Sequence, residues 1–84
     1  MKTYNVLIDP YKAPQGYGVR VVPASSPAAS DKPAHYVTGP GLLRVMTKFG
    51  FTPGTQTQIM ANLTANENQK IEAVSLSDEV AAEF

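Results

Sequence analysis

The stretch TGPGLLRVMTKFGFTPG, residues 38–54, decides the predicted fold, because its pattern is that of a short amphipathic helix on which the rest of the chain can pack. Pro40 suits the first turn, and Gly50 suits the left-handed position just past the last turn. The pattern predicts a helix over residues 40–49, with Phe51 folding back onto its apolar face. That face consists of side chains at the i, i+3, i+4 and i+7 spacing of a helix, namely Leu42, Val45, Met46 and Phe49.

Length and composition limit the size of the domain and the kinds of site that it can contain. A chain of 84 residues is expected to form one domain and to bury about 60–65% of the surface that it exposes when unfolded. Because the chain has no cysteine, disulfides, thiolate nucleophiles and cysteine-ligated zinc sites are excluded. The apolar run near the N-terminus, residues 6–8, is too short for a signal peptide or a membrane span. We therefore expect a soluble, cytoplasmic protein with no membrane association.

The charges are unevenly distributed, although they sum to zero over the whole chain. Residues 1–50 carry six basic and two acidic residues, a net charge of +4, whereas residues 51–84 carry one basic and five acidic residues, a net charge of −4. Folding can bring the two parts together and close internal ion pairs. Alternatively, the basic part can form an electropositive face for an acidic partner.

The N-terminal part of the chain predicts an antiparallel hairpin. Apolar and polar side chains alternate in residues 3–9 and again in residues 17–22, as expected for strands with one face on a core. The Pro- and Gly-rich residues between them predict a loop longer than the minimal two-residue turn. Pro23 ends the second strand or marks it as an edge strand. A low-complexity, proline-containing loop that we expect to be flexible follows at residues 24–34.

Residues 55–65 are compatible with two structures. In a helix, Thr52 would be the N-cap and Pro53 would occupy the first turn. In a strand, one face would carry Thr55, Thr57, Ile59, Ala61 and Leu63. Because threonine and asparagine have low helix propensity, the strand is the preferred prediction.

The remaining segments complete the predicted architecture. Residues 35–38 add a short strand before the helix, and the alternation in residues 70–76 predicts a strand that closes a second hairpin. Ser77 is a typical N-cap for a terminal helix whose first turn carries Asp78 and Glu79. The predicted order is β-β-α-β-β-α. This is a small α+β fold in which two hairpins form one antiparallel sheet and one or two helices pack on one face.

No catalytic signature emerges from the sequence. His35 is the only histidine, and Ser25, Ser26, Ser30 and Asp31 lie near it along the chain. A hydrolytic triad needs a nucleophile that is held in place, whereas these serines belong to the proline-containing loop and no glycine-flanked nucleophile turn is present. We therefore predict that the protein is not an enzyme and assign no catalytic residues.

Metal and cofactor sites are not indicated either. Asp78, Glu79 and Glu83 have helical spacing, which the start of a helix explains, and a lone histidine without cysteine disfavours a zinc site. Residues 39–41, GPG, precede a helix, where backbone N–H groups can bind anions. Neither the P-loop nor the dinucleotide-binding glycine pattern follows. We predict no metal and no cofactor.

Aromatic and basic residues gather in the first hairpin. Residues 15–21, QGYGVRV, share a few glycine and aromatic positions with the strand motifs of RNA-recognition and cold-shock modules, too few to place the chain in either family. With Tyr11 in the preceding turn, Tyr17 and Arg20 can form a basic, aromatic surface.

These observations favour a non-enzymatic interaction module of the adaptor, regulator or inhibitor type, which docks on a protein partner or on a second copy of itself. Nucleic-acid binding by the basic, tyrosine-containing N-terminal half is the alternative, although the isoelectric point near 6.5 disfavours it. The predicted partner-binding residues are Tyr11, Tyr17, Arg20, Lys32, Arg44 and Lys48.

Overall fold

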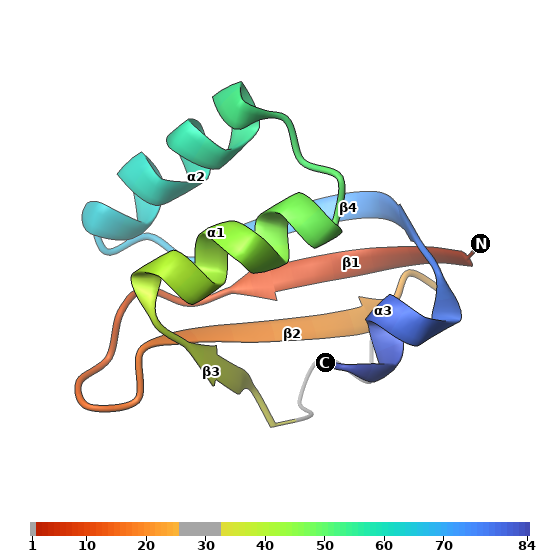
Figure 1. Ribbon diagram of the computed structural model, residues 1–84, viewed down its shortest axis with the longest axis horizontal. Coiled ribbons are helices and arrows are strands. Elements are labelled where there is room, and N and C mark those ends of the chain that lie inside the picture. The colour runs from red at the N-terminus through yellow and green to blue at the C-terminus, as the bar shows by residue number, and fades with distance from the viewer. Residues whose placement is uncertain (1, 26–32) are drawn as a thin grey trace.

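The computed structural model describes residues 2–25 and 33–84 and shows an α+β fold (Figure 1). Its elements are β1 Lys2–Ile8, β2 Tyr17–Pro23, β3 His35–Val37, α1 Gly39–Lys48, α2 Pro53–Thr64, β4 Gln69–Leu76 and α3 Asp78–Ala82. The predicted class, a small antiparallel sheet with helices packed on one face, is confirmed. Most of the loop expected at residues 24–34 lies outside the described residues.

The four strands within the described residues form one antiparallel sheet in the order β3-β2-β1-β4. The predicted hairpin of β1 and β2 is confirmed, with Val6 opposite Val21 and Ile8 opposite Val19. Because side chains alternate along a strand, these four lie on the same face, where they are buried. The chain passes from β3 at one edge to β4 at the other through α1 and α2, so these helices cover that face (Figure 1).

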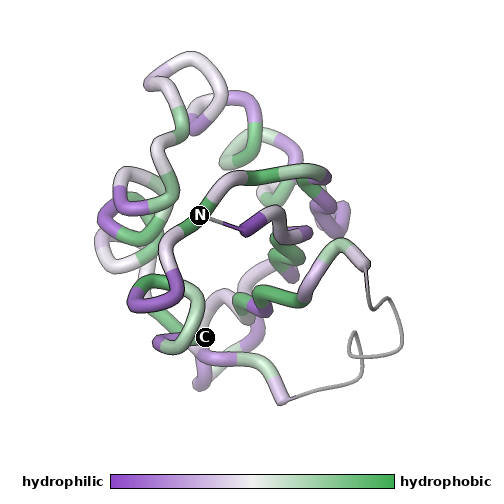
Figure 2. The backbone as a smooth tube through the Cα atoms, turned by 90° about the vertical axis from the view of Figure 1, so that its right-hand side faces the viewer, coloured by the Kyte–Doolittle hydropathy of each residue, from purple (hydrophilic) through white to green (hydrophobic). Residues whose placement is uncertain are grey.

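The predicted apolar stripe attaches α1 to the sheet. Its residues Leu42, Val45, Met46 and Phe49 are all buried, and they share one core with side chains from β1, β2, β4 and α2. Figure 2 shows hydrophobic and hydrophilic residues alternating along the chain, in keeping with elements that each have one buried side.

Both ends of α1 form as the sequence indicates, and the helix begins one residue earlier than predicted. The Thr38 hydroxyl accepts a hydrogen bond of 3.3 Å from the Gly41 amide and so caps the first turn. At the other end Gly50 has a φ of 83°, and the Phe51 amide donates to the Met46 carbonyl at 3.1 Å. These features are typical of a Schellman motif, which turns Phe51 back toward the core.

The preferred prediction of a strand over residues 55–65 is wrong, because this segment belongs to helix α2. The alternative prediction applies: Thr52 is the N-cap and Pro53 lies in the first turn. Ile59 and Leu63 are buried in the core. Capping and the burial of one side therefore outweigh the low helix propensity of the threonines. The second predicted hairpin does not form, and β4 pairs with β1 instead.

The last two elements were predicted correctly in type, since β4 is a strand and α3 is a helix capped by Ser77. The Ser77 hydroxyl accepts a hydrogen bond of 3.2 Å from the Val80 amide. The sequence did not reveal a bulge in β4, where Ala73 has a φ of 58° and its amide donates to the Asn5 side chain at 3.3 Å. The bulge shifts the register between β1 and β4.

The second face of the sheet is not covered by any helix of the described residues, and we call it the open face. The pairing register assigns to this face the side chains that alternate with the core residues. They are Asn5 and Leu7 of β1, Arg20 and Val22 of β2, Tyr36 of β3 and Lys70 of β4. Val22 is buried, with 2% of its surface exposed, so the accessible part of this face lies toward the β1–β2 loop.

Candidate functional site

The loop between β1 and β2 folds back on itself and is held against β3. Lys12 and Gly16 exchange two backbone hydrogen bonds of 2.9 Å, and the Ala13–Pro14 peptide bond between them is cis. Gly16 has a φ of 110°, and a β-carbon at this position would collide with the carbonyl oxygen of Val37. Both the backbone conformation and the close approach of β3 therefore require glycine here.

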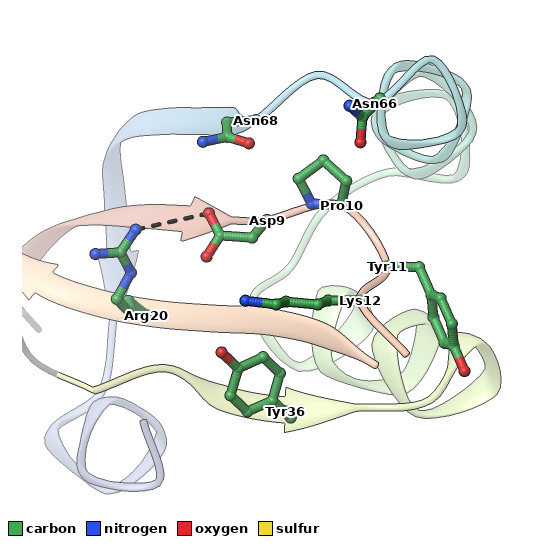
Figure 3. Close-up of a pocket in the computed structure, with 8 residues that line it drawn as sticks. All are labelled: Asp9, Pro10, Tyr11, Lys12, Arg20, Tyr36, Asn66 and Asn68. Carbon is green, nitrogen blue, oxygen red and sulfur yellow. Dashed lines mark ion pairs between the residues drawn. The ribbon is translucent and has the colours of Figure 1, made fainter. Parts of the chain in front are cut away.

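A pocket of about 490 Å³ lies at the end of the sheet, between this loop, the open face and the turn after α2 (Figure 3). Its volume is in the range that small-ligand and side-chain binding sites occupy, about 300–1,000 Å³. We call it the sheet-end pocket. It is lined by Asp9, Pro10, Tyr11, Lys12, Arg20, Tyr36, Asn66 and Asn68.

Two opposite charges meet inside the sheet-end pocket. A carboxylate oxygen of Asp9 lies 3.6 Å from a guanidinium nitrogen of Arg20, and both side chains are partly buried. In Figure 3 the Lys12 side chain is extended and directs its ammonium toward this pair, with the ring of Tyr36 below it. Within the described ranges, no carboxylate lies within 4.0 Å of the Lys12 ammonium. Lys12 therefore brings to the pocket a positive charge that no described acidic group neutralises.

Gly18 allows the groups of the open face to approach one another. It lies opposite Tyr36 in the β2–β3 pairing, and the Asp9 amide donates to its carbonyl at 2.8 Å. A β-carbon at Gly18 would lie 3.2 Å from a carboxylate oxygen of Asp9 and 3.3 Å from the ring of Tyr36. The β-carbon of Ala34 would be nearer still, at 3.1 Å. Because these distances are short for a β-carbon, any side chain at this position would displace one or more of these three neighbours.

Exposed tyrosines form the rim of the pocket. Tyr36 is 45% exposed and Tyr11 is 57% exposed. The ring of Tyr11 packs edge-on against that of Tyr17, with 5.5 Å between centroids and 70° between planes. Figure 3 shows the Tyr11 ring turned away from the Asp9–Arg20 pair, so that it extends the surface outward.

Three of the six predicted partner-binding residues lie together at this site. Tyr11 and Arg20 line the pocket, and Tyr17 supports Tyr11. Sequence reasoning missed Tyr36, although alternation in the predicted short strand before the helix would have pointed to it. Asn68 could not be found in this way, because its position depends on α2, which was predicted as a strand.

The other three predicted residues do not join the site. Arg44 and Lys48 lie on the exposed side of α1, the helix that covers the opposite face of the sheet. Lys48 forms an ion pair of 3.1 Å with Glu83 of the C-terminal segment. Lys32 lies outside the described residues.

A second hollow of about 590 Å³ lies at the other end of β1 and β2. Its basic group, the Lys2 ammonium, is 4.0 Å from the Asp78 carboxylate. Lys2 is the one charged residue among the described residues that line this hollow. It is lined by Lys2, Thr3, Tyr4, Pro23, Ala24 and Ser25.

The residues considered for catalysis do not form a described constellation. The ring of His35 lies edge-on to that of Phe84, with 5.3 Å between centroids. Ser26, Ser30 and Asp31 lie outside the described residues. In the part of the chain that the structure describes, no three His, Cys, Asp or Glu side chains are grouped so that they could hold a metal ion.

Comparisons with protein-family models, with curated proteins and with solved structures gave no match to this chain. Among the helices of residues 2–25 and 33–84, none has the length and apolar character needed to cross a bilayer. The side chains of the sheet-end pocket and the surfaces beside it are therefore the features that bear on function.

Proposed function

We propose that the protein is a non-catalytic interaction module that binds a protein partner through the sheet-end pocket and the tyrosines at its rim. One observation supports this above all: the exposed Tyr11 and Tyr36 and the partly buried Arg20 line one pocket, beside a sheet face that no described helix covers. Tyrosine and arginine are the residues that most often dominate the binding energy of protein interfaces. Such a module acts as an adaptor, regulator or inhibitor by binding to its partner rather than by modifying it. Its cysteine-free composition suits the reducing cytoplasm, where we expect it to act.

Docking on this surface has more support than pairing of a partner strand with the edges of the sheet. The β3 strand at one edge has only three residues. The β4 strand at the other edge is longer, but it contains the bulge at Ala73 and carries the Lys70–Glu72 ion pair of 3.5 Å. Short edge strands, bulges and charges are the usual features that prevent edge pairing.

Site-specific photo-crosslinking tests the proposal. A benzophenone-bearing phenylalanine analogue replaces either Tyr36 of β3 or Leu43 of α1, whose side chains are 45% and 44% exposed. In an extract of the producing cells, we expect a discrete protein adduct from position 36 and not from position 43. The purified partner should then bind the unmodified protein and bind Tyr36→Ala more weakly. Equal yields of the same adduct from both positions would contradict the proposal.

Single-stranded nucleic acid is the second candidate, because exposed tyrosines and a lysine at the end of a sheet can stack bases and attract phosphates. The residues that line the pocket carry only one net positive charge, which limits the attraction to a phosphate chain. We therefore prefer a protein partner. A crosslinked adduct from position 36 that nuclease digests would show that the partner is a nucleic acid. An adduct that contains two copies of the chain would show self-association.

A further inference from the structure

We infer that the sheet-end pocket receives an acidic side chain of the partner, whose carboxylate pairs with the Lys12 ammonium beside the ring of Tyr36. This inference rests on the proposed function and adds the chemistry of the bound group. It starts from the distribution of ion pairs, since most basic groups of the described residues already have an acidic partner. The pairs are Lys2–Asp78, Arg20–Asp9, Lys48–Glu83 and Lys70–Glu72.

Lys12 and Arg44 are the two basic side chains of the described residues that form no ion pair. Arg44 projects from the exposed side of α1, whereas Lys12 lines a concave site and directs its ammonium inward (Figure 3). The backbone of Lys12 is fixed by its two hydrogen bonds to Gly16. The loop therefore anchors the backbone of Lys12, and an incoming anion can reach its exposed ammonium without breaking a described ion pair.

The charge of the pocket matches a carboxylate better than a phosphate. Asp9 balances Arg20 at 3.6 Å, so the lining residues retain the single positive charge of Lys12. The exposed side chain of Glu67 belongs to the same turn as Asn66 and Asn68, and it would repel a chain of phosphates more strongly than a single carboxylate. A glutamate or aspartate side chain brings one negative charge, and its aliphatic part can pack on Tyr36.

The remaining lining groups suit a peptide. Asn66 and Asn68 stand on the wall opposite Tyr36 (Figure 3), and their amides can both donate to and accept from a peptide backbone. A pocket of about 490 Å³ has room for one side chain and the adjoining backbone. The occupant is therefore a short acidic segment of a partner protein.

An amide chemical-shift titration of the isotope-labelled full chain tests this inference. The probe is the peptide acetyl-Gly-Glu-Leu-Glu-Gly-amide, and its matched control replaces both glutamates by glutamine. We expect the glutamate peptide to shift the amides of Lys12, Arg20, Tyr36 and Asn68, and the glutamine peptide to bind several-fold more weakly. An exposed ion pair of this kind changes affinity by up to about fivefold, which such a titration resolves.

Two variants separate a defined contact from general attraction. Lys12→Gln and Arg44→Gln remove the same charge from the two basic side chains that lack a described ion pair, so only Lys12→Gln should weaken binding, by about three- to fivefold. Lys12→Arg should restore it. The inference is overturned if the two Gln variants bind alike, if both peptides bind alike, or if neither peptide shifts the pocket amides. Stronger shifts of the same amides with oligothymidine, or shifts on dilution of the protein alone, would also overturn it.

These outcomes are distinct from failure of the proposed function. If the partner captured at position 36 binds Lys12→Gln as tightly as the unmodified protein but binds Tyr36→Ala weakly, the interaction surface stands and the carboxylate contact does not.

Discussion

Replacement of Gly16 by alanine should destabilise the protein much more than the same replacement at Gly50. Both glycines have positive φ, 110° at Gly16 and 83° at Gly50. A β-carbon at Gly50 would meet nothing within 4 Å, whereas at Gly16 it would collide with the Val37 carbonyl oxygen. The Gly50 variant therefore measures the backbone conformation alone. The difference between the two variants measures the contact of the β1–β2 loop with β3, together with the more positive φ of Gly16.

The expected magnitudes follow from these two effects. The left-handed backbone region costs a residue with a β-carbon about 1–2 kcal/mol, which is the expected loss for Gly50→Ala. Overpacking adds about 1–3 kcal/mol at Gly16, so that variant should lose about 2–5 kcal/mol in total. For a chain of 84 residues, whose stability is typically about 4–13 kcal/mol, this is a large fraction.

Urea denaturation followed by circular dichroism measures both free energies of unfolding. The slope of free energy against urea concentration should stay the same in the two variants, because the buried area does not change. Losses that agree within about 0.5 kcal/mol, the usual scatter of such comparisons, would refute the claim that β3 restricts Gly16. The same result would also mean that β3 does not help to hold the loop that carries the Lys12 backbone.

Substitutions at three further positions test the core packing, the N-cap of α2 and the bulge in β4 by the same urea experiment. Met46→Ala should lose about 2–5 kcal/mol, because this side chain of α1 is fully buried in the core; a loss below 1 kcal/mol would contradict the packing. Thr52→Ala should lose about 1 kcal/mol with the N-cap of α2, and Thr52→Ser should retain most of the stability. Ala73→Gly should stabilise the protein by about 0.5–1 kcal/mol, although it lies in a strand, because relief of the positive φ exceeds the added backbone entropy. A loss of stability in that variant would argue against the bulge.

Local sequence signals predicted α1 because they all agreed. The apolar spacing, Pro40 and Gly50 each indicate the same helix, and the structure shows it within one residue of the predicted bounds. In α2 the signals conflicted, since the threonines favour a strand and the ends favour a helix. Thr52 caps one end, and Asn66, with a φ of 64°, follows the other in a left-handed conformation. The capping residues at the two ends predicted α2 better than the low helix propensity of its threonines did. Capping satisfies backbone groups at the helix ends that would otherwise lack hydrogen bonds.

The candidate site was predictable only where it is local in sequence. Tyr11, Tyr17 and Arg20 belong to one hairpin, whose pairing follows from alternation and turn residues. The contribution of Tyr36 depends on β3 pairing with β2, and that of Asn68 depends on where α2 ends. The sequence could not supply these contacts, because they are set by packing between elements that are distant along the chain.

The affinity of the crosslinked and purified partner for Tyr36→Ala, compared with Leu43→Ala, tests the central claim most directly. The two side chains are almost equally exposed, and they belong to different elements, β3 and α1. If the open face and its pocket form the interface, Tyr36→Ala should weaken binding about tenfold or more, as for a tyrosine at the centre of an interface, and Leu43→Ala should not change it. Unchanged affinity for Tyr36→Ala, with loss of binding by Leu43→Ala, would contradict the claim and place the interface on the helices.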